Sequence, residues 1–257
     1  MSTWGIGDIH GCYAELMKLY FKLLREGLNP DKDVVVFMGD YIDRGPDSKT
    51  VVSQMIEWHN KYPHWVFLFG NHEDIFLNWY YNKNVYQEDS GWSCFLSNGG
   101  IETLKSYETT KYDKKFPEDH IKFFTEVAIL FYETDNYIFV HGGLIPGTPI
   151  NDIKALINET ILKALIWARE EFIDDDYDWG KFVIFGHSAA YKRRWGELGM
   201  PIMMKNKCGI DGAVCPPASK NLLAIELPEK KIHGIKAGSL EYFALDYNIT
   251  RLYNNHI

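Results

Sequence analysis

Residues 34–40 read VVVFMGD, a short and unbroken apolar run that ends in glycine and aspartate. A continuous run of β-branched and aromatic residues is typical of a strand that is buried on both faces. Four more runs share this design: WGIGD at 4–8, VFLFGN at 66–71, YIFVH at 137–141 and FVIFGH at 182–187. The sequence therefore predicts five buried strands, each of which ends in polar residues.

Helical patterns separate several of these runs. A leucine-rich stripe at 16–24 closes at Gly27, and a second helix begins after a cap at Asp47 or Ser48. Helical spacing also marks three further segments, 73–81, 117–126 and 158–171. Alternation of strands and helices predicts a layered α/β domain.

Beyond His187 the sequence becomes β-rich. Short strand-like segments, separated by turns, occupy residues 202–204, 208–211, 222–227, 231–235 and 241–246. We therefore expect an α/β (α+β) fold with two packed β-sheets flanked by helices, in place of one Rossmann-type sheet. The sequence has no G-x-G-x-x-G and no G-x-x-x-x-G-K-[ST], so nucleotide cradles of these types have no support.

Composition narrows the range of partners. The 257 residues are 46% apolar and carry a formal charge of −8 at pH 7, without a long Lys/Arg run. Duplex nucleic acid is therefore a poor partner, and an anionic phosphate would need metals or a few arginines for local positive charge.

The sequence also bears on location. No apolar run approaches the roughly 20 residues of a membrane helix, and the first residues lack the basic region of a secretory signal. The four cysteines show no C-x-x-C spacing and are expected to be reduced thiols. We expect a cytoplasmic protein with no membrane partner.

Side chains that can bind metals stand at or just beyond the ends of the five predicted strands. They are Asp8, His10, Asp40, Asn71, His141 and His187. In open α/β sheets, ligands bind outside the carboxyl ends of the strands. One Asp or His at a strand end is commonly a cap, but five coordinated occurrences predict a metal site. Oxygen and imidazole donors suit Mn, Fe or Zn, and six donors favour two metals that share one carboxylate.

Glycine stands beside nearly every one of these side chains. The glycines are Gly7, Gly11, Gly39, Gly70, Gly142 and Gly186. Glycine allows the backbone to turn sharply and to approach a ligand closely.

Longer motifs surround the same residues: GDIHG at 7–11, GDYIDRG at 39–45, GNHE at 70–73, HGG at 141–143 and GH at 186–187. Together they resemble the phosphoprotein phosphatase family of calcineurin-like metallophosphoesterases, including its bacterial and bacteriophage-type serine/threonine phosphatases. The resemblance implies a four-layer αββα fold in which residues 1–257 form a single catalytic domain.

The resemblance also implies a role for each position in the metal site. One metal would be held by Asp8, His10 and Asp40, and a second would share Asp40 and be completed by Asn71, His141 and His187. The two ions, divalent or trivalent and expected to be manganese (or iron or zinc), would polarise the phosphoryl oxygens. A hydroxide that bridges them would attack phosphorus in line, without a covalent phosphoenzyme.

Further residues of these motifs would act on the substrate. His72 would be the general acid that protonates the leaving oxygen, with Asp43 orienting its ring. Arg44 would clamp the phosphate, because its planar fork suits that geometry.

A second phosphate arginine is assigned to Arg169, in LIWARE at 165–170. Arg169 could instead form an ion pair on a helix surface, and Arg193 or Arg194 competes for the role.

Two substrate classes remain open. The first is a phosphorylated protein or peptide, the substrate of a serine/threonine-type protein phosphatase. The second is a dinucleoside polyphosphate, since NGGIETLKSY at 98–107 also resembles a stretch of the bacterial diadenosine tetraphosphatases. Residues 87–107 could line the substrate approach or serve packing alone. A catalytically silent scaffold is disfavoured, because all the expected ligands, His72 and Arg44 are present.

Other features are predicted to carry no chemistry. The DDDYDWG segment at 174–180 departs from the spacing of a calcium loop and is interpreted as a solvated acidic turn. Five histidines outside the motifs are predicted to lie on the surface: His59, His64, His120, His233 and His256.

Overall fold

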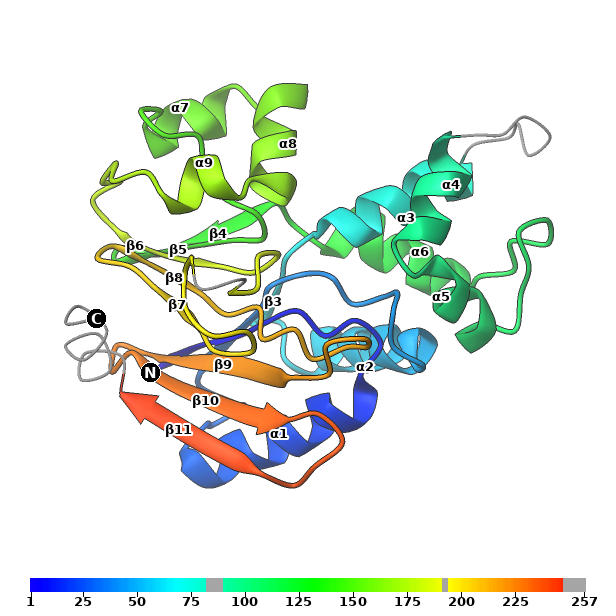
Figure 1. Ribbon diagram of the computed structural model, residues 1–257, viewed down its shortest axis with the longest axis horizontal. Coiled ribbons are helices and arrows are strands. Elements are labelled where there is room, and N and C mark those ends of the chain that lie inside the picture. Colours follow the sequence, from blue (N-terminus) through cyan, green and yellow to red (C-terminus); the bar gives the residue numbers. More distant parts are fainter. Residues whose placement is uncertain (82–89, 191–193, 247–257) are drawn as a thin grey trace.

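Two β-sheets lie face to face in the computed structural model, which describes residues 1–81, 90–190 and 194–246. Helices cover the outer face of each sheet, so that the two sheets form the middle of four layers (Figure 1). The predicted fold of two packed sheets flanked by helices is confirmed.

The first sheet has six strands in the order β11-β10-β9-β1-β2-β3. Their bounds are Thr3–Ile6 (β1), Val34–Phe37 (β2), Val66–Phe67 (β3), Asn221–Leu227 (β9), Lys231–Lys236 (β10) and Tyr242–Asp246 (β11). Strands β1, β2 and β3 run parallel, and β9 pairs with the other side of β1 in antiparallel direction.

The second sheet has five strands in the order β4-β5-β6-β8-β7. Their bounds are Phe131–Glu133 (β4), Tyr137–Val140 (β5), Phe182–Phe185 (β6), Ile202–Met203 (β7) and Lys207–Gly209 (β8). Strands β5, β6 and β8 are parallel neighbours.

All five predicted strands are present, and they are divided between the two sheets. Three of them belong to the first sheet and two to the second. The β-rich region after His187 is likewise divided between the two sheets. An apolar run records burial but not the strand to which it will hydrogen-bond, because that partner is distant in sequence.

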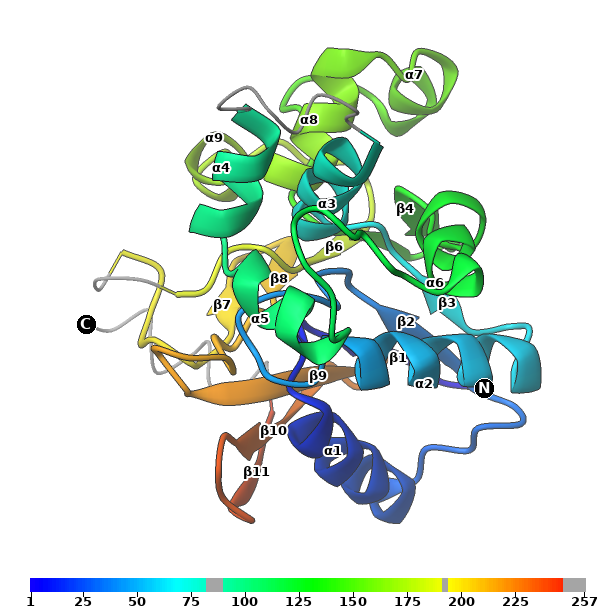
Figure 2. The ribbon, with the colours of Figure 1, turned by 90° about the vertical axis from the view of Figure 1, so that its right-hand side faces the viewer.

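Helices form the outer layers (Figures 1 and 2). The first sheet is covered by α1 (Tyr13–Glu26) and α2 (Ser48–Lys61), and the second by α7 (Ile150–Ala155), α8 (Glu159–Trp167) and α9 (Glu170–Ile173). A lateral group contains α3 (Asn71–Tyr81), α4 (Ser90–Ser97), α5 (Gly100–Ser106), α6 (Glu118–Lys122) and the π-helix η1 (Phe123–Val127). No helix of the described residues is long and apolar enough to cross a membrane.

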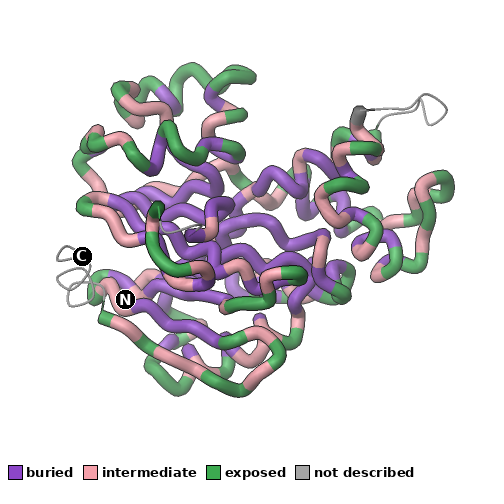
Figure 3. Tube along the Cα trace, viewed as in Figure 1, coloured by how far each residue is buried: buried purple, intermediate pink, exposed green. Residues whose placement is uncertain are grey.

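Three apolar clusters hold the layers together. One lies between the sheets and includes Val36, Phe139, Ile184 and Ile225, all fully buried. The others lie between each sheet and its helices. Buried residues concentrate in the central strands and in the loops that follow them (Figure 3). Burial of this kind is the main stabilising contribution to the fold.

The predicted helix at 158–171 is interrupted: α8 ends at Trp167 and α9 begins at Glu170. The backbone N–H groups of Gly142 and Gly143 donate to the carbonyl oxygens of Leu165 and Ala164, at 2.6 and 3.1 Å. These donors satisfy two of the last four carbonyls of α8, which an α-helix leaves without a partner of its own when it ends there.

The surface prediction is wrong for two of the five histidines. His120 is buried between Tyr107 Oη, 2.7 Å from its Nδ1, and Ser53 Oγ, 3.2 Å from its Nε2. His233 is buried in β10, where it hydrogen-bonds Glu226 and Tyr242. The hydrogen-bond partners of both histidines come from other segments of the chain. The sequence pattern around each histidine does not reveal them.

The remaining predictions concern three other histidines and the acidic segment at 174–180. His59 is half-buried, His64 is exposed, and His256 lies outside the described residues. The acidic turn is confirmed, since the side chains of Asp174, Asp176 and Asp178 are exposed.

Candidate active site

The loops that follow five strands meet at one end of the two packed sheets. The first sheet contributes Asp8, His10 and Asp40, and also Asn71, the first residue of α3. The second contributes His141 after β5 and His187 after β6. All six are buried. The site is thus complete only where the two sheets pack together.

Asp40 lies at the centre of this group. Its Oδ2 lies 3.4 Å from His10 Nε2, and its Oδ1 lies 3.3 Å from His141 Nε2. Two sets of close donor atoms share Asp40: one adds His10 and His72, and the other adds His141 and His187. One carboxylate therefore faces a different set of donors with each oxygen.

Backbone carbonyls orient two of the rings. His10 Nδ1 lies 2.9 Å from the carbonyl oxygen of Ile42, and His141 Nδ1 lies 2.6 Å from that of Met38. A carbonyl only accepts, so both Nδ1 atoms carry the proton and each Nε2 faces the centre. Hydrogen bonds of this kind fix the orientation of metal-binding histidines.

Asp8 and His187 leave two buried atoms without a hydrogen-bond partner. Asp8 Oδ2 accepts from the backbone N–H of His187 at 2.9 Å. Asp8 Oδ1 and His187 Nε2 are buried and have no hydrogen-bond partner within residues 1–81, 90–190 and 194–246. Buried polar atoms are nearly always satisfied, so these two atoms fit the binding of cations at the centre. The oxygen and imidazole donors suit Mn, Fe or Zn.

Burial and mutual contact shift the ionisation of these groups. Burial lowers the pKa of His10 well below its ordinary value and raises that of Asp8 well above it. Burial acts on His141 in the lowering direction, but Asp40 outweighs it and raises the pKa of His141 to about 9. The same contact holds the pKa of Asp40 well below its ordinary value, despite burial. The centre thus contains buried groups whose charges depend strongly on one another.

The backbone is strained at the same place. Positive φ angles occur at His10 (47°), Asp40 (53°), Asp43 (71°), Arg44 (67°) and His187 (60°). Left-handed backbone costs energy in residues with a side chain, and it concentrates at functional sites. These five residues lie in the loops that follow β1, β2 and β6.

Glycine permits the close approach that the sequence predicts. A Cβ atom on Gly186 would lie 2.3 Å from Asp8 Oδ1, and one on Gly70 would lie 2.3 Å from Asp40 Oδ1. Neither position has room for a side chain beside its carboxylate.

His72 lies between Asp43 and Arg44. Its Nδ1 is 2.7 Å from Asp43 Oδ2, and its Nε2 is 2.8 Å from Arg44 Nη2. Arg44 Nη1 lies 2.9 Å from His10 Nε2, so one guanidinium donates to both rings.

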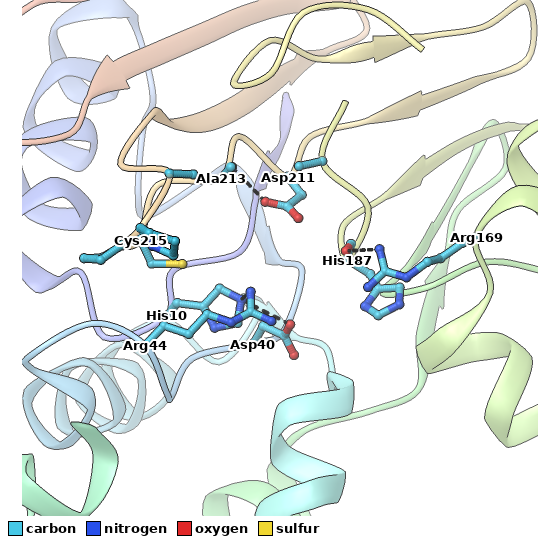
Figure 4. Close-up of a pocket in the computed structure, with 12 residues that line it drawn as sticks. His10, Asp40, Arg44, Arg169, His187, Asp211, Ala213 and Cys215 are labelled. Carbon is cyan, nitrogen blue, oxygen red and sulfur yellow. Dashed lines mark hydrogen bonds and ion pairs between the residues drawn. The ribbon is translucent and has the colours of Figure 1, made fainter. Parts of the chain in front are cut away.

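A pocket of about 290 Å³ opens onto this group (Figure 4). Arg44 and Arg169 line it from opposite sides, and Arg169 Nη1 donates to the backbone oxygen of His187 at 2.9 Å. Arg194 forms an ion pair with Asp174 at the surface, away from the pocket lining, and Arg193 lies outside the described residues. Of the two described candidates for the second phosphate arginine, Arg169 lines the pocket and Arg194 does not.

A second pocket of about 460 Å³ adjoins the first, and both are lined by Arg44, Pro216 and Pro217. Its other lining residues are Ser97, Asn98, Gly99, Ile101 and Glu102. The adjacent aromatic residues pack instead, with the Phe95 ring stacked on Trp79 at 4.7 Å. The segment that follows residue 89 thus serves both packing and the pocket wall, and residues 87–89 lie outside the described residues.

Three buried residues beside the site were not singled out from the sequence. Glu73 accepts from the backbone N–H groups of Asp40, Tyr41 and Gly70 at 2.9 to 3.0 Å, and burial, followed by the charge of Asp40, raises its pKa to about 7. Asp211 lines the pocket, and Thr103 hydrogen-bonds Asp43. Glu73 belongs to the GNHE motif and Thr103 to the NGGIETLKSY stretch at 98–107, whereas Asp211 lies outside the motifs quoted above.

The sequence model of the calcineurin-like phosphoesterase family matches residues 1–214. The chain belongs to this family. The chain is 27% identical over 180 residues to serine/threonine-protein phosphatase 2 of Salmonella typhimurium, a match that covers 70% of this chain and 63% of that relative. It is 32% identical over 155 residues to the asymmetrical bis(5'-nucleosyl)-tetraphosphatase of a Geobacillus species, covering 54% of this chain and 56% of the relative.

The fold of the chain has a counterpart among solved structures. A candidate diadenosine tetraphosphatase superposes with a TM-score of 0.58 and 20% identity, covering 92% of this chain and 93% of that one. The matches to the two curated relatives span less than two thirds of their lengths. At 20% identity, the likeness to the solved structure shows the fold alone.

Proposed function

We propose that the protein is a two-metal phosphoester hydrolase whose metals share Asp40. The supporting observation is that Asp40 Oδ2 faces His10 Nε2 at 3.4 Å while its Oδ1 faces His141 Nε2 at 3.3 Å. Histidine donors on both sides of one carboxylate fit a pair of metal ions that would share it.

The remaining donors would divide between the two metals. Asp8 would join His10 on one side, because its Oδ1 is buried and unpartnered. Asn71 and His187 would join His141 on the other; Asn71 Oδ1 is 3.0 Å from His141 Nε2, and His187 Nε2 is unpartnered. Both sheets supply donors, which supports a single catalytic domain in the chain of residues 1–257.

When bound, the two cations would polarise the phosphoryl oxygens and supply the activated water that attacks phosphorus. We propose manganese as the working metal, with iron or zinc as alternatives for the same donors. A cytoplasmic location is proposed as well, supported by four cysteines that are all free thiols.

The side chains of the protein would bind the phosphate and move the proton. Arg44 and Arg169 would hold phosphate oxygens from opposite sides of the pocket. Arg44 donates to His10 Nε2 and His72 Nε2 in this structure, and it would release both atoms when His10 holds a metal and His72 carries a proton. That release frees His72 Nε2 for the proton that the leaving oxygen receives.

Asp43 would hold the ring of His72 in place for this step. Its Oδ2 accepts the Nδ1–H of His72 at 2.7 Å, in full burial. A general acid oriented by a carboxylate accelerates such steps by about 10²- to 10⁴-fold.

Two substitutions test these roles separately. Asp40→Asn is expected to abolish both metal content and manganese-dependent hydrolysis. His72→Asn should retain the metals but slow turnover by about 10²-fold or more for esters with poor leaving groups. His64→Asn, on an exposed histidine, is the matched control. Full activity of Asp40→Asn would remove the shared carboxylate from the mechanism.

We propose a phosphorylated serine or threonine in a protein as the substrate; its support is the likeness to the Salmonella phosphatase. A dinucleoside polyphosphate is the second candidate, favoured by the pocket that Asn98, Gly99 and Ile101 line beside Arg44. A phosphoserine/phosphothreonine peptide and diadenosine tetraphosphate are to be compared by kcat/KM in the presence of manganese. Preference for the dinucleotide would overturn the protein-phosphatase assignment and leave the metal centre intact.

A further inference from the structure

Helix α5 touches the turn that carries Asp43 and Arg44. The backbone N–H of Arg44 donates to the carbonyl oxygen of Gly99 at 3.2 Å, immediately before α5. A Cβ on Gly99 would lie 2.8 Å from Arg44 Cγ, so the contact is close. None of the motifs at the strand ends includes this helix.

Thr103 of α5 is fully buried and forms two hydrogen bonds with Asp43. Its hydroxyl donates to Asp43 Oδ1 at 2.6 Å and accepts from the backbone N–H of Asp43 at 2.9 Å. Ser48 Oγ lies 3.2 Å from the same hydroxyl and also accepts from that N–H. The threonine thus fixes both the carboxylate and the left-handed backbone of Asp43 (φ 71°).

The two oxygens of Asp43 have separate partners. Oδ1 receives the Thr103 hydroxyl, and Oδ2 receives Nδ1–H of His72 at 2.7 Å. Rotation of the carboxylate would weaken both hydrogen bonds together. The hydroxyl therefore holds the plane of the carboxylate that orients the imidazole.

We infer that Thr103 is a positioning residue for proton delivery by His72: through Asp43 it keeps the imidazole aimed at the leaving oxygen. This inference rests on the proposed function, in which His72 is the general acid. A misplacement of about 1 Å in a reacting group can cost about 10²-fold in rate, so a residue two hydrogen bonds away can matter.

Helix α5 is itself fixed on its other sides, which gives Thr103 a rigid base. Ser106 Oγ accepts the backbone N–H of Lys49 at 2.9 Å, which ties α5 to α2. Tyr107, directly after α5, hydrogen-bonds the buried His120 at 2.7 Å. Groups held on braced elements keep a more precise geometry than groups on loops.

The test compares two esters in each preparation of the manganese-loaded full chain. Phenyl phosphate releases the more basic oxygen and depends on the proton, whereas p-nitrophenyl phosphate depends on it little. Thr103→Val, which keeps the shape but removes the hydroxyl, should lower the phenyl/p-nitrophenyl ratio of kcat/KM about tenfold or more. Thr103→Ser should restore the wild-type ratio, and Thr125→Val, on an exposed threonine, should not change it.

The ratio does not depend on the folded fraction, because both esters meet the same protein. A wild-type ratio in Thr103→Val would overturn the inference, as would an equal fall in Thr103→Ser. A metal-loaded wild type that hydrolyses neither ester would instead refute the proposed function itself.

Discussion

Gly186 separates β6 from His187, and its hydrogen faces the carboxylate of Asp8. A Cβ there would lie 2.3 Å from Asp8 Oδ1, 3.3 Å from Met38 Cβ and 3.4 Å from Asp8 Cγ. In the Gly186→Ala variant the carboxylate must therefore move by about 1 Å to reach van der Waals contact. The movement breaks or lengthens the bond of 2.9 Å from the His187 N–H to Asp8 Oδ2.

The expected cost follows from these contacts. Loss of a hydrogen bond to a charged group costs about 1.5–3 kcal/mol, and overpacking adds about 1–3 kcal/mol. The reduced entropy of the unfolded chain offsets about 0.4–1 kcal/mol of this. We expect Gly186→Ala to lower the free energy of unfolding by about 1.5–5.5 kcal/mol.

A double-mutant cycle isolates the clash. Urea unfolding in a chelating buffer is to be measured for the wild type, Gly186→Ala, Asp8→Ala and the double variant, so that metal binding does not contribute. With the Asp8 carboxylate absent, Gly186→Ala should cost no more than about 1 kcal/mol, which gives a coupling of about 2 kcal/mol. Additive effects within about 0.5 kcal/mol would refute the argument from the close approach.

Three further predictions concern other parts of the molecule. Glu73→Gln should destabilise the fold by about 2 kcal/mol, because the NH₂ group of the new amide would face a backbone N–H that donates to the carboxylate in the wild type. Denaturant unfolding measures this loss, and Asp74→Asn in the same helical turn is the control. Arg169→Ala should lower kcat/KM for phosphate esters by about tenfold or more with unchanged metal content, and an unaltered value would remove this arginine from phosphate binding. Burial lowers the pKa of His233 to about 4, so protonation favours the unfolded state and stability falls as the pH drops below about 6.5. His233→Gln should lose about 2 kcal/mol less stability than the wild type between pH 7 and pH 4.5, and parallel losses in urea unfolding would contradict the shift.

Local pattern predicted most of the central strands and the first two helices. The run at 34–40 forms β2 and the turn to Asp40, and the stripe closed by Gly27 forms α1. Gly27 ends that helix in the left-handed conformation (φ 119°), as a glycine cap does. These features depend on neighbours within a few residues, so the chain itself determines them.

The composition of the candidate site was also readable from the sequence. The six donor residues follow five apolar runs, and the structure places all six at one end of the packed sheets. Within each sheet the carboxyl ends of the parallel strands meet at one edge, so position along a strand predicts proximity, and the packing of the two sheets brings the two edges together. Their metal-binding roles remain the proposal made above.

Tertiary structure alone decided which sheet each strand joined. Strands β5 and β6 belong to a different sheet from β1 and β2, although the apolar runs of all four look alike in the sequence. It also decided where α8 ends, because the backbone N–H groups of Gly142 and Gly143 donate to carbonyl oxygens in its last turn. Arg169, which follows this helix end, lines the pocket. Thr103 lies 60 positions from the Asp43 carboxylate that it binds. Such contacts join residues that no local period relates, so only the packed chain determines them.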